Sequence, residues 1–566
     1  MTFSTNRGRW LPAVAIAVIA VVLTVASRSP LAGTQPPVAA RPRPAGPQAA
    51  ETTVAPAGGA ARAADSFAID RLLEAGWAEA GIEPAAPATD LAVLRRAWLA
   101  LAGTIPSLEE IRRFEADPRP DRLDHAITAL LADRRSAEAV ARRLAPVLVG
   151  EDVGQFIVFR RDRFTTWLAD QLHANRPWDA IVHDMVASRG LWTDTPAVNF
   201  VTQAAEEGRI NADKLAGRAC RAFLGQRIDC AQCHDHPFAA WKQPQFEGLA
   251  ACFAQARLTG VGVEDDPGRV HRIDAMAPAA LATPMQGGRN VPPRVPYGEE
   301  WFPIAGTHRE NLAAWIVHAE NRRFDRAIAN RAWWLLFGKA WHEPVDDLPD
   351  PPTLAATGAP DDLLDLLADD FRTHGRDLRR LLTVIASTRA FRLASTHPLL
   401  DSPDGCDRVA ATWAAFPLTP LAPQQVIGAM VATTSLQTID QDSHLLTRTI
   451  RLLRENDFVR EYGRIQDGDG RVRPATIPQA LVRMNGKFAR EMAAANGISA
   501  TGRIAGMARD DDARLELAFL VALTRRPTAE ERESLLPLLT ETKQKGRGVE
   551  DVVWALFNCP EFCWNH

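Results

Sequence analysis

The sequence predicts a mainly α-helical protein in which two helical lobes are joined by a segment rich in Pro and Gly with a few short strands. Apolar residues recur at helical spacing along much of the chain after residue 64, and this periodicity favours helices. The interval 258–302 breaks the pattern, because it contains many Gly and Pro residues and only short Val and Ile pieces. We therefore expect an N-terminal helical domain at 65–257, a connector at 258–302 and a C-terminal helical domain at 303–566.

Composition and charge exclude several classes of protein. The 566 residues are 46% hydrophobic and 24% charged, which is typical of a globular protein with a sizeable core. The 65 Lys and Arg residues against 69 Asp and Glu residues give a net charge of −4, so no basic footprint suggests a nucleic-acid partner. Seven Cys residues are too few for a disulfide-built scaffold of this length.

The first 64 residues are expected to lie outside the fold. Arg7 and Arg9 precede an apolar run at 10–26, a pattern typical of an export signal. Residues 1–27 are therefore predicted to be a signal peptide or an N-terminal anchor in the inner membrane, with a run that is short for a span of about 20 residues. Residues 28–64 are dense in Pro and Ala and predict a disordered linker. We expect a periplasmic or otherwise extracytoplasmic protein, either free or anchored by residues 10–26.

Helices can be placed from apolar spacing and capping residues. Residues 92–102 carry Val, Leu and Trp at helical spacing, and Gly103 ends that segment. Ser107 and Glu110 have the spacing of a capping box, in which the hydroxyl accepts from a free backbone N–H and the carboxylate reaches back. Further helical patterns lie at 164–173 and 178–188.

The same pattern recurs near the other end of the chain. Residues 520–531 mirror residues 99–110, since each has an apolar helix end, a short turn with Pro, and then Ser or Thr three residues before Glu. In the second copy these two residues are Thr528 and Glu531. Capping boxes are common, so we interpret the repeat as a structural echo without chemistry of its own.

One motif has a clear chemical meaning, the run Cys230-Ala-Gln-Cys233-His234. C-x-x-C-H is the pattern for covalent attachment of haem c. Two thiols three residues apart on one helical turn can reach the two haem vinyl groups, and the next residue places an imidazole under the iron as axial ligand. A thioether from Met276 or Met285 could serve on the opposite face, with His271 nearby, or that face could be open.

Other chemistry fits the same residues. Cys230, Cys233 and either His234 or His236 could bind zinc together with a fourth ligand from elsewhere. The two motif cysteines could instead form a local disulfide, and Cys220 could pair with Cys252. Under the haem hypothesis His236 lies too close to His234 to bind the opposite face of the same iron, so it would be a supporting or surface residue.

A second polar site is suggested by Asp346 and Asp347, which follow Pro344. Paired carboxylates bind divalent cations or act as acid and base, and they also cap segments or pair with an Arg. Asn330 and Arg331 are expected to make buried hydrogen bonds with this carboxylate turn. No G-x-S-x-G, H-E-x-x-H or phosphate-binding Gly loop is present.

Residues 221–241, with the C-x-x-C-H motif followed by Asp-His-Pro-Phe, resemble the signature of the planctomycete-specific cytochrome-like proteins. These are exported bacterial proteins with paired domains of unknown function, of the PSCyt and PSD type. The similarity continues over 99–117, 311–347, 363–387, 479–486 and 554–562. The resemblance implies cytochrome character and a sulfatase-like or redox protein partner, with a link to polysaccharide use. Many relatives carry an extra N-terminal cytochrome module, and here the spacer stands in its place.

Three functions follow as hypotheses. The first is an exported c-type haem protein with a redox or electron-transfer role in the periplasm, using Cys230, Cys233 and His234. The second is a non-enzymatic, zinc-stabilised scaffold or binding module of an extracytoplasmic assembly. The third is a hydrolase acting on polysaccharide through Asp346 or Asp347. The sequence does not decide whether the protein is an enzyme.

Overall fold

The computed structural model describes residues 59–150, 159–273, 289–350, 362–439, 477–497 and 499–566. The prediction of a mainly α-helical protein with a few short strands is confirmed, and residues from Gly58 to His566 form one compact unit. The predicted signal or anchor at 1–27, and residues 28–58 of the linker predicted at 28–64, lie outside the described residues. Residues 59–64 begin helix α2 (Gly59–Ala80), so the helical part starts earlier than the sequence predicted. Within the described parts, no helix combines the length and apolar character that a membrane span requires.

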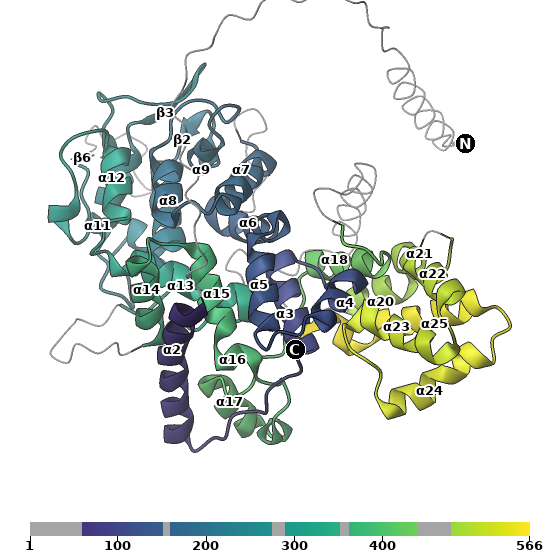
Figure 1. Ribbon diagram of the computed structural model, residues 1–566. Coiled ribbons are helices and arrows are strands. Elements are labelled where there is room, and N and C mark those ends of the chain that lie inside the picture. The colour runs from purple at the N-terminus through teal and green to yellow at the C-terminus, as the bar shows by residue number, and fades with distance from the viewer. Residues whose placement is uncertain (1–58, 151–158, 274–288, 351–361, 440–476, 498) are drawn as a thin grey trace, which may run out of the picture. The chain divides into compact units, whose positions relative to one another are not determined.

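The N-terminal half is a succession of helices that pack against one another (Figure 1). Helix α3 ends where Gly103 adopts a left-handed conformation at φ 66°, as the sequence predicts. The helices are α2 (Gly59–Ala80), α3 (Asp90–Ala102), α4 (Leu108–Ala116), α5 (Arg122–Ala132), α6 (Arg134–Val149), α7 (Arg161–His173), α8 (Trp178–Ala187), α9 (Asn199–Thr202), α10 (Ala212–Ala219) and α11 (Gln243–Phe253). Short single turns are η1 (Pro196–Val198), η2 (Cys220–Leu224) and η3 (Asp229–Gln232).

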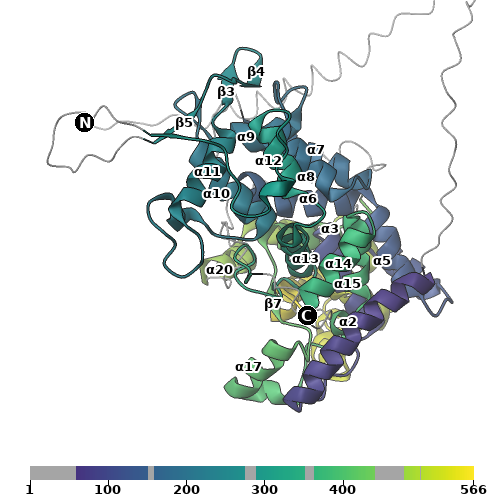
Figure 2. The same cartoon turned by 90° about the vertical axis from the view of Figure 1, so that its left-hand side faces the viewer.

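The strands described are short and pair only as antiparallel two-stranded ribbons. Four of the eight described strands, β3 to β6, lie in or at the edge of the Pro- and Gly-rich interval, beside α11 and α12 (Figure 2). The pairs are β1 (Ala205–Glu206) with β2 (Arg209–Ile210), β3 (Ala256–Thr259) with β4 (Gly262–Asp265), β5 (His271–Ile273) with β6 (Arg289–Val291), and β7 (Thr419–Pro420) with β8 (Trp564–Asn565).

The C-terminal half is again helical. Helix α13 is the most buried of its helices, with consecutive buried residues from Phe324 to Phe337, and it contacts α3, α14 and α15. The helices are α12 (His308–Ile316), α13 (Arg322–Phe337), α14 (Leu363–Thr373), α15 (Leu378–Ser387), α16 (Arg389–Arg392), α17 (Pro403–Thr412), α18 (Pro423–Thr433), α20 (Ile477–Asn485), α21 (Lys487–Ala493), α22 (Ala500–Met507), α23 (Asp511–Leu523), α24 (Ala529–Thr540) and α25 (Lys545–Asn558). Short turns are η4 (Glu299–Trp301), η5 (Pro398–Asp401) and η6 (Pro560–Cys563).

Both predicted capping boxes form. Ser107 Oγ accepts from the backbone N–H of Glu110, whose carboxylate accepts from the N–H of Ser107 at 2.9 Å. Thr528 and Glu531 repeat the arrangement at the start of α24. Because α3 ends at Gly103 and α23 ends just before Thr524, both in the left-handed conformation, the two segments share helix end, turn and cap.

The buried apolar side chains form two clusters. The larger cluster joins residues between Ile69 and Phe416, and the smaller joins Leu99 and Ile105 to residues between Leu421 and Cys563. Two buried arginines of α3 connect the clusters through polar contacts. Arg95 Nη1 donates to the carbonyl of Ala522 at 3.0 Å, and Arg96 Nε donates to that of His566 at 2.7 Å. Burial lowers the pKa of Arg95 to about 10 and that of Arg96 to about 9.

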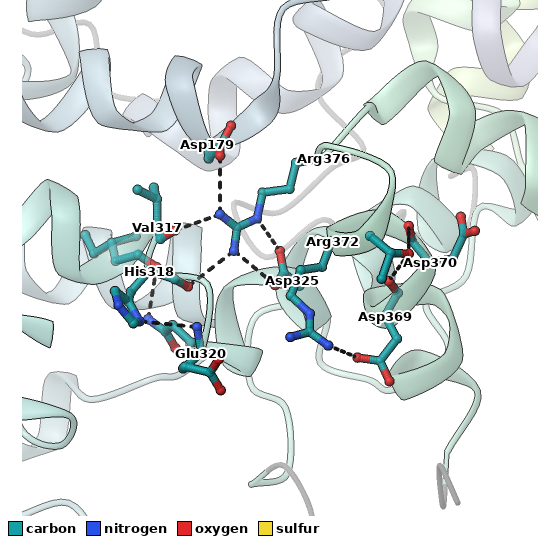
Figure 3. Close-up of polar contacts among 12 residues, drawn as sticks. Asp179, Val317, His318, Glu320, Asp325, Asp369, Asp370, Arg372 and Arg376 are labelled. Atoms are coloured by element: carbon teal, nitrogen blue, oxygen red, sulfur yellow. Dashed lines mark hydrogen bonds and ion pairs between the residues drawn. The ribbon is translucent and has the colours of Figure 1, made fainter.

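Arg376 connects helices from both halves of the chain (Figure 3). Its guanidinium donates to Asp325 Oδ1 of α13 at 2.8 Å and to Asp179 Oδ2 of α8 at 3.3 Å. It also donates to the carbonyls of Val317 and His318, which end α12, at 2.7 and 3.2 Å. One buried cation thus satisfies acceptors on three helices, so α8, α12 and α13 hold a common position.

Candidate functional site

The C-x-x-C-H motif lies on an exposed turn between α10 and α11. Helix α10 continues into the π turn η2 and stops at Gly225, which is left-handed at φ 60° and donates its N–H to the carbonyl of Cys220. A Cβ at Gly225 would meet Leu348 at 2.9 Å, so the position needs glycine for its conformation and its close contact. Ile228 is then fully buried, and it fixes the chain directly before the turn η3 (Asp229–Gln232).

Cys230 and Cys233 share this one turn. The N–H of Cys233 donates to the carbonyl of Cys230 at 3.4 Å, and both side chains are exposed. Ala231, between them, is fully buried and anchors the turn on the protein side. The arrangement presents two thiols on a single helical turn, as the spacing predicts, and no side chains seal them from solvent.

One hydrogen bond fixes the tautomer of the neutral His234 ring. Its Nδ1 lies 2.7 Å from the backbone carbonyl of Asp235. A carbonyl oxygen only accepts, so Nδ1 carries the proton, and in the neutral ring Nε2 has a free lone pair. A hydrogen bond from one ring nitrogen to a backbone carbonyl is the support that metal-binding histidines use, and here it leaves Nε2 of an exposed imidazole available as a ligand.

His236 is held as the other tautomer. Its Nδ1 accepts from the backbone N–H groups of Phe238 at 3.2 Å and Ala239 at 3.0 Å. In the neutral ring the proton is therefore on Nε2, and neither nitrogen has a lone pair to give to a metal. The N–H of His236 also donates to the carbonyl of Trp241 at 2.8 Å, so this residue organises the loop. Phe238, at the loop's tip, is 96% exposed.

Asp235 attaches the loop to the start of α11. Its carboxylate accepts from the backbone N–H of Gln243 at 3.0 Å and pairs with Lys242 Nζ at 3.1 Å. The hydrogen bond from Gln243, and then the one from Lys242, lower the pKa of Asp235. The carboxylate therefore stays ionised beside His234 over the physiological pH range.

The chain segment that precedes the motif, residues 225–227, is held by the predicted carboxylate turn. Arg227 donates through Nε and Nη2 to Asp346 Oδ1 at 2.9 and 2.6 Å, and its backbone N–H reaches Asp347 Oδ1 at 3.3 Å. Leu348 donates its N–H to the carbonyl of Gly225 at 2.7 Å. We call the contact of residues 225–227 with residues 346–348 the brace. Asp346 thus pairs with the side chain of an Arg, one of the roles that the sequence suggested, and Asp347 accepts from the backbone of the same residue.

Asn330 and Arg331 lie beside the brace and have separate structural roles. Asn330 Nδ2 donates to the carbonyl of His342 at 2.9 Å and its Oδ1 accepts from the His342 N–H at 3.0 Å, so it holds the turn before Asp346 as expected. Arg331 instead donates to the carbonyl of Ala222 at 2.6 Å, in the π turn η2. Full burial lowers the pKa of Arg331 to about 10.

The other predicted ligands are not gathered at the motif. Across the described ranges, no group of three or more His, Cys, Asp and Glu side chains is arranged to hold a metal ion. All seven cysteines carry free thiols, and burial raises the pKa of Cys220 and that of Cys252, the latter to about 12. Met276 and Met285 lie outside the described residues. His271 Nε2 lies 3.5 Å from Asp213 Oδ1, and Gln232 of the motif reaches the other oxygen of Asp213 at 3.5 Å.

Sequence reasoning missed a buried cluster around Asp362. Its carboxylate accepts from Trp341 Nε1 at 2.8 Å, contacts His342 Nε2 at 2.7 Å and pairs with Arg326. Burial acts to raise the pKa of Asp362, but the hydrogen bond and charge of His342 and the hydrogen bond from Trp341 outweigh it and lower the pKa. No local signal marks such a residue, because its partners lie on α13 and in the turn after it.

Comparison with known protein families agrees with this architecture. Residues 68–258 match the family model PSCyt2, a protein of unknown function (DUF1549), and residues 308–451 match PSD1, a protein of unknown function (DUF1553). The chain belongs to the planctomycete cytochrome-like family. No curated protein and no solved structure matches this member of the family.

In this planctomycete cytochrome-like protein the site draws on both matched regions. The PSCyt2 region supplies the motif turn and Arg227, and the PSD1 region supplies Asp346, Asp347 and Leu348 of the brace. Gln226 belongs to the same contact, since its Nε2 donates to the carbonyl of Leu348 at 2.6 Å. The two matched regions thus contact each other at the residues that immediately precede the C-x-x-C-H turn in the sequence.

Proposed function

We propose that the protein is an exported c-type haem-binding protein with a redox or electron-transfer role. The observation that carries the proposal is the pair of exposed thiols on one turn, followed by an imidazole whose Nε2 is free. Cys230 and Cys233 would hold the group as thioethers, each sulfur adding to one vinyl carbon while the thiol hydrogen goes to the other. His234 would be the axial ligand. When bound, haem supplies one-electron chemistry.

The chain's own residues prepare this site in four ways. The hydrogen bond from His234 Nδ1 to the carbonyl of Asp235 orients the ring and leaves the lone pair on Nε2. His236 and the attachment of Asp235 to Gln243 fix the loop that follows. The brace through Arg227 fixes the chain that precedes the turn. Phe238 supplies an exposed apolar surface next to the ligands.

The proposal includes the predicted location outside the cytoplasm. Thioether attachment needs reduced thiols and a maturation system that works after export, which agrees with the export signal proposed for residues 1–27. An electron partner would approach the exposed motif loop. The zinc-stabilised scaffold has less support, because the ring nitrogens of His236 are committed within the loop and no described cluster is arranged to hold a metal.

The deciding experiment is the absorbance spectrum of the full-length protein, produced in a host that matures c-type cytochromes. We expect a Soret band and a haem stain that survives denaturing electrophoresis. Replacing Cys230 and Cys233 together by Ser should abolish the covalent stain, and His234→Ala should alter the Soret band. Cys406→Ser is the matched control, since this cysteine is partly buried and hydrogen-bonds to the carbonyl of Leu400.

Two results would contradict the proposal. A colourless wild-type protein from the maturing host would show that the motif does not take haem. Elemental analysis that finds zinc and no iron would instead favour the scaffold hypothesis.

A further inference from the structure

A pocket of about 250 Å³ lies among α3, α4 and α5, and it contains none of the residues of the motif turn. Helix α5 packs against both α3 and α4 (Figure 1). Its apolar walls come from Trp98, Phe114 and Leu130, which are buried, and from Ala126 and Ala129 on the face of α5. The pocket is therefore a pre-formed depression with an apolar floor, built entirely in the PSCyt2 region.

Trp98, which lines the pocket, has a donor without an acceptor beneath the pocket surface. Trp98 is 6% exposed, and its indole N–H has no hydrogen-bond partner in the described part of the chain. A buried N–H without an acceptor costs free energy, and tryptophan N–H groups usually find a partner when buried. Because this N–H is itself covered, the pocket offers a ligand the apolar ring of Trp98 and not its N–H.

The rim of the pocket is rich in guanidinium groups. Arg113 pairs with Glu109 through Nη2, whereas Arg119 and Arg122 pair with Asp117 and Asp90 through Nε and Nη2. For each of the three arginines, Nη1 has no acceptor among the residues that the structure describes. The carboxylates at the rim are thus engaged, while N–H donors are still open.

Arg122 and His125 extend this donor-rich rim over the apolar floor. The guanidinium of Arg122 lies 4.9 Å from the ring centre of Phe114, so a cation covers the edge of the aromatic wall. His125 is exposed at the mouth of the pocket. Open donors above an apolar floor match a ligand with an anionic, acceptor-rich end and an apolar body.

We propose that this pocket binds a small organic carboxylate whose body is an apolar six-membered ring. The volume sets the size, because a dry cavity of about 150 Å³ already holds benzene and drug-sized ligands need about 300 Å³ or more. The ring lies against Trp98 and Phe114, and the carboxylate accepts from the open edges of Arg119 and Arg122. This inference is independent of the proposed function, since it uses neither the motif turn nor the brace.

Calorimetric titration of the full-length protein with benzoate tests the site. We expect a dissociation constant at or below about 1 mM, which corresponds to ordinary efficiency for a ligand of this size. Benzyl alcohol, which keeps the ring and loses the charge, should bind at least about tenfold more weakly. Glucuronate, which keeps the charge and carries a polar ring, should also bind at least about tenfold more weakly.

Two pairs of variants locate the binding. Ala129→Leu fills the pocket and should abolish benzoate binding, whereas Ala132→Leu adds the same side chain to an exposed position of α5 outside the pocket and should leave it unchanged. Arg119→Gln should weaken binding about tenfold, and Arg112→Gln, an exposed arginine of α4 that does not line the pocket, should not.

The outcomes separate clearly. Absence of benzoate binding to the wild-type protein overturns the site. Benzoate binding that survives Ala129→Leu places the ligand elsewhere and also overturns it. If benzyl alcohol binds more tightly than benzoate, the proposal that the ligand has an anionic end is wrong. If glucuronate binds more tightly than benzoate, the proposal that the ligand has an apolar ring is wrong.

Discussion

Replacing Arg376 by Met removes the cation that joins α8, α12 and α13, and its cost should depend strongly on pH. Arg376 and Asp325 are almost completely buried, with side chains 8% and 2% exposed. Burial raises the pKa of Asp325 from 3.8 to about 6, and the hydrogen bond and charge of Arg376 only partly offset this effect. The methionine keeps a Cβ at the same left-handed position, where Arg376 has φ 55°, so backbone strain is unchanged.

The expected magnitude follows from the protonation state of Asp325. At pH 8 the carboxylate is ionised, and removing its partner leaves a buried charge at a cost of about 3–5 kcal/mol in the free energy of unfolding. At pH 5 it is mostly protonated in the wild type, and the variant loses chiefly the bonds to the carbonyls of Val317 and His318, about 1–2 kcal/mol. Because the folded pKa of Asp325 is raised, its ionisation also lowers wild-type stability as pH rises from about 4 to 6.

Urea unfolding of the wild type and the variant at pH 5, 6, 7 and 8 measures this difference. The control is Arg372→Met, which removes a half-exposed ion pair with Asp369 near Arg376 (Figure 3) and should cost about 0–1 kcal/mol. Its cost should change less with pH than that of Arg376→Met, because Arg372 acts on Asp325 only through its charge. A cost of Arg376→Met that does not change between pH 5 and pH 8, or that equals the cost of Arg372→Met, would refute the reasoning. Thermal melts are less suitable, because an unfolding entropy of about 1 kcal/mol/K converts 3–5 kcal/mol into only about 3–5 °C.

The remaining predictions concern the brace and a cap. Asp346→Asn should lower the free energy of unfolding by about 1–2 kcal/mol, because Arg227 loses its charged acceptor, whereas Asp347→Asn should change it by less than about 0.5 kcal/mol; urea unfolding compares the two, and equal effects would contradict the brace. Gly225→Ala should cost about 1–2 kcal/mol from left-handed strain, and it should reduce the covalent haem signal per mole of protein; an unchanged signal would show that the turn does not need this support. Thr528→Ala should cost about 1 kcal/mol by removing the cap of α24 without affecting any spectrum.

Local features of the fold could be predicted because their causes lie within a few residues. The capping boxes at Ser107 and Thr528 depend on a hydroxyl and a carboxylate three residues apart, and both form. The end of α3 at Gly103 depends on the one residue type that adopts φ 66° without strain. The helical spacing of apolar residues, together with Gly, Pro and capping residues at the ends of segments, therefore predicted the helices. The Gly and Pro residues of 258–302 also predicted that this interval would contain short strands.

Partners far apart in the sequence could not be predicted in the same way. Asp346 was expected to bind a cation, act as acid or base, or pair with an Arg, and only the structure shows that Arg227, 119 residues earlier, fills that role. Arg331 was expected at the carboxylate turn, but it satisfies the carbonyl of Ala222. The sequence shows that a polar residue lies in a segment that is expected to be buried and must therefore find a hydrogen-bond partner. It does not show which of many acceptors the fold brings within hydrogen-bonding distance.

The two histidines of the motif show where sequence information ends and geometry begins. His234 and His236 are the same residue type two positions apart, and spacing alone assigned either of them to zinc. Their environments differ at Nδ1. That of His234 faces a carbonyl, which requires a proton on the nitrogen, and that of His236 faces two N–H groups, which require a lone pair. The proton positions are therefore opposite, and only His234 can present Nε2 to an iron or another metal. A ligand set that was ambiguous in the sequence becomes specific through three backbone hydrogen bonds.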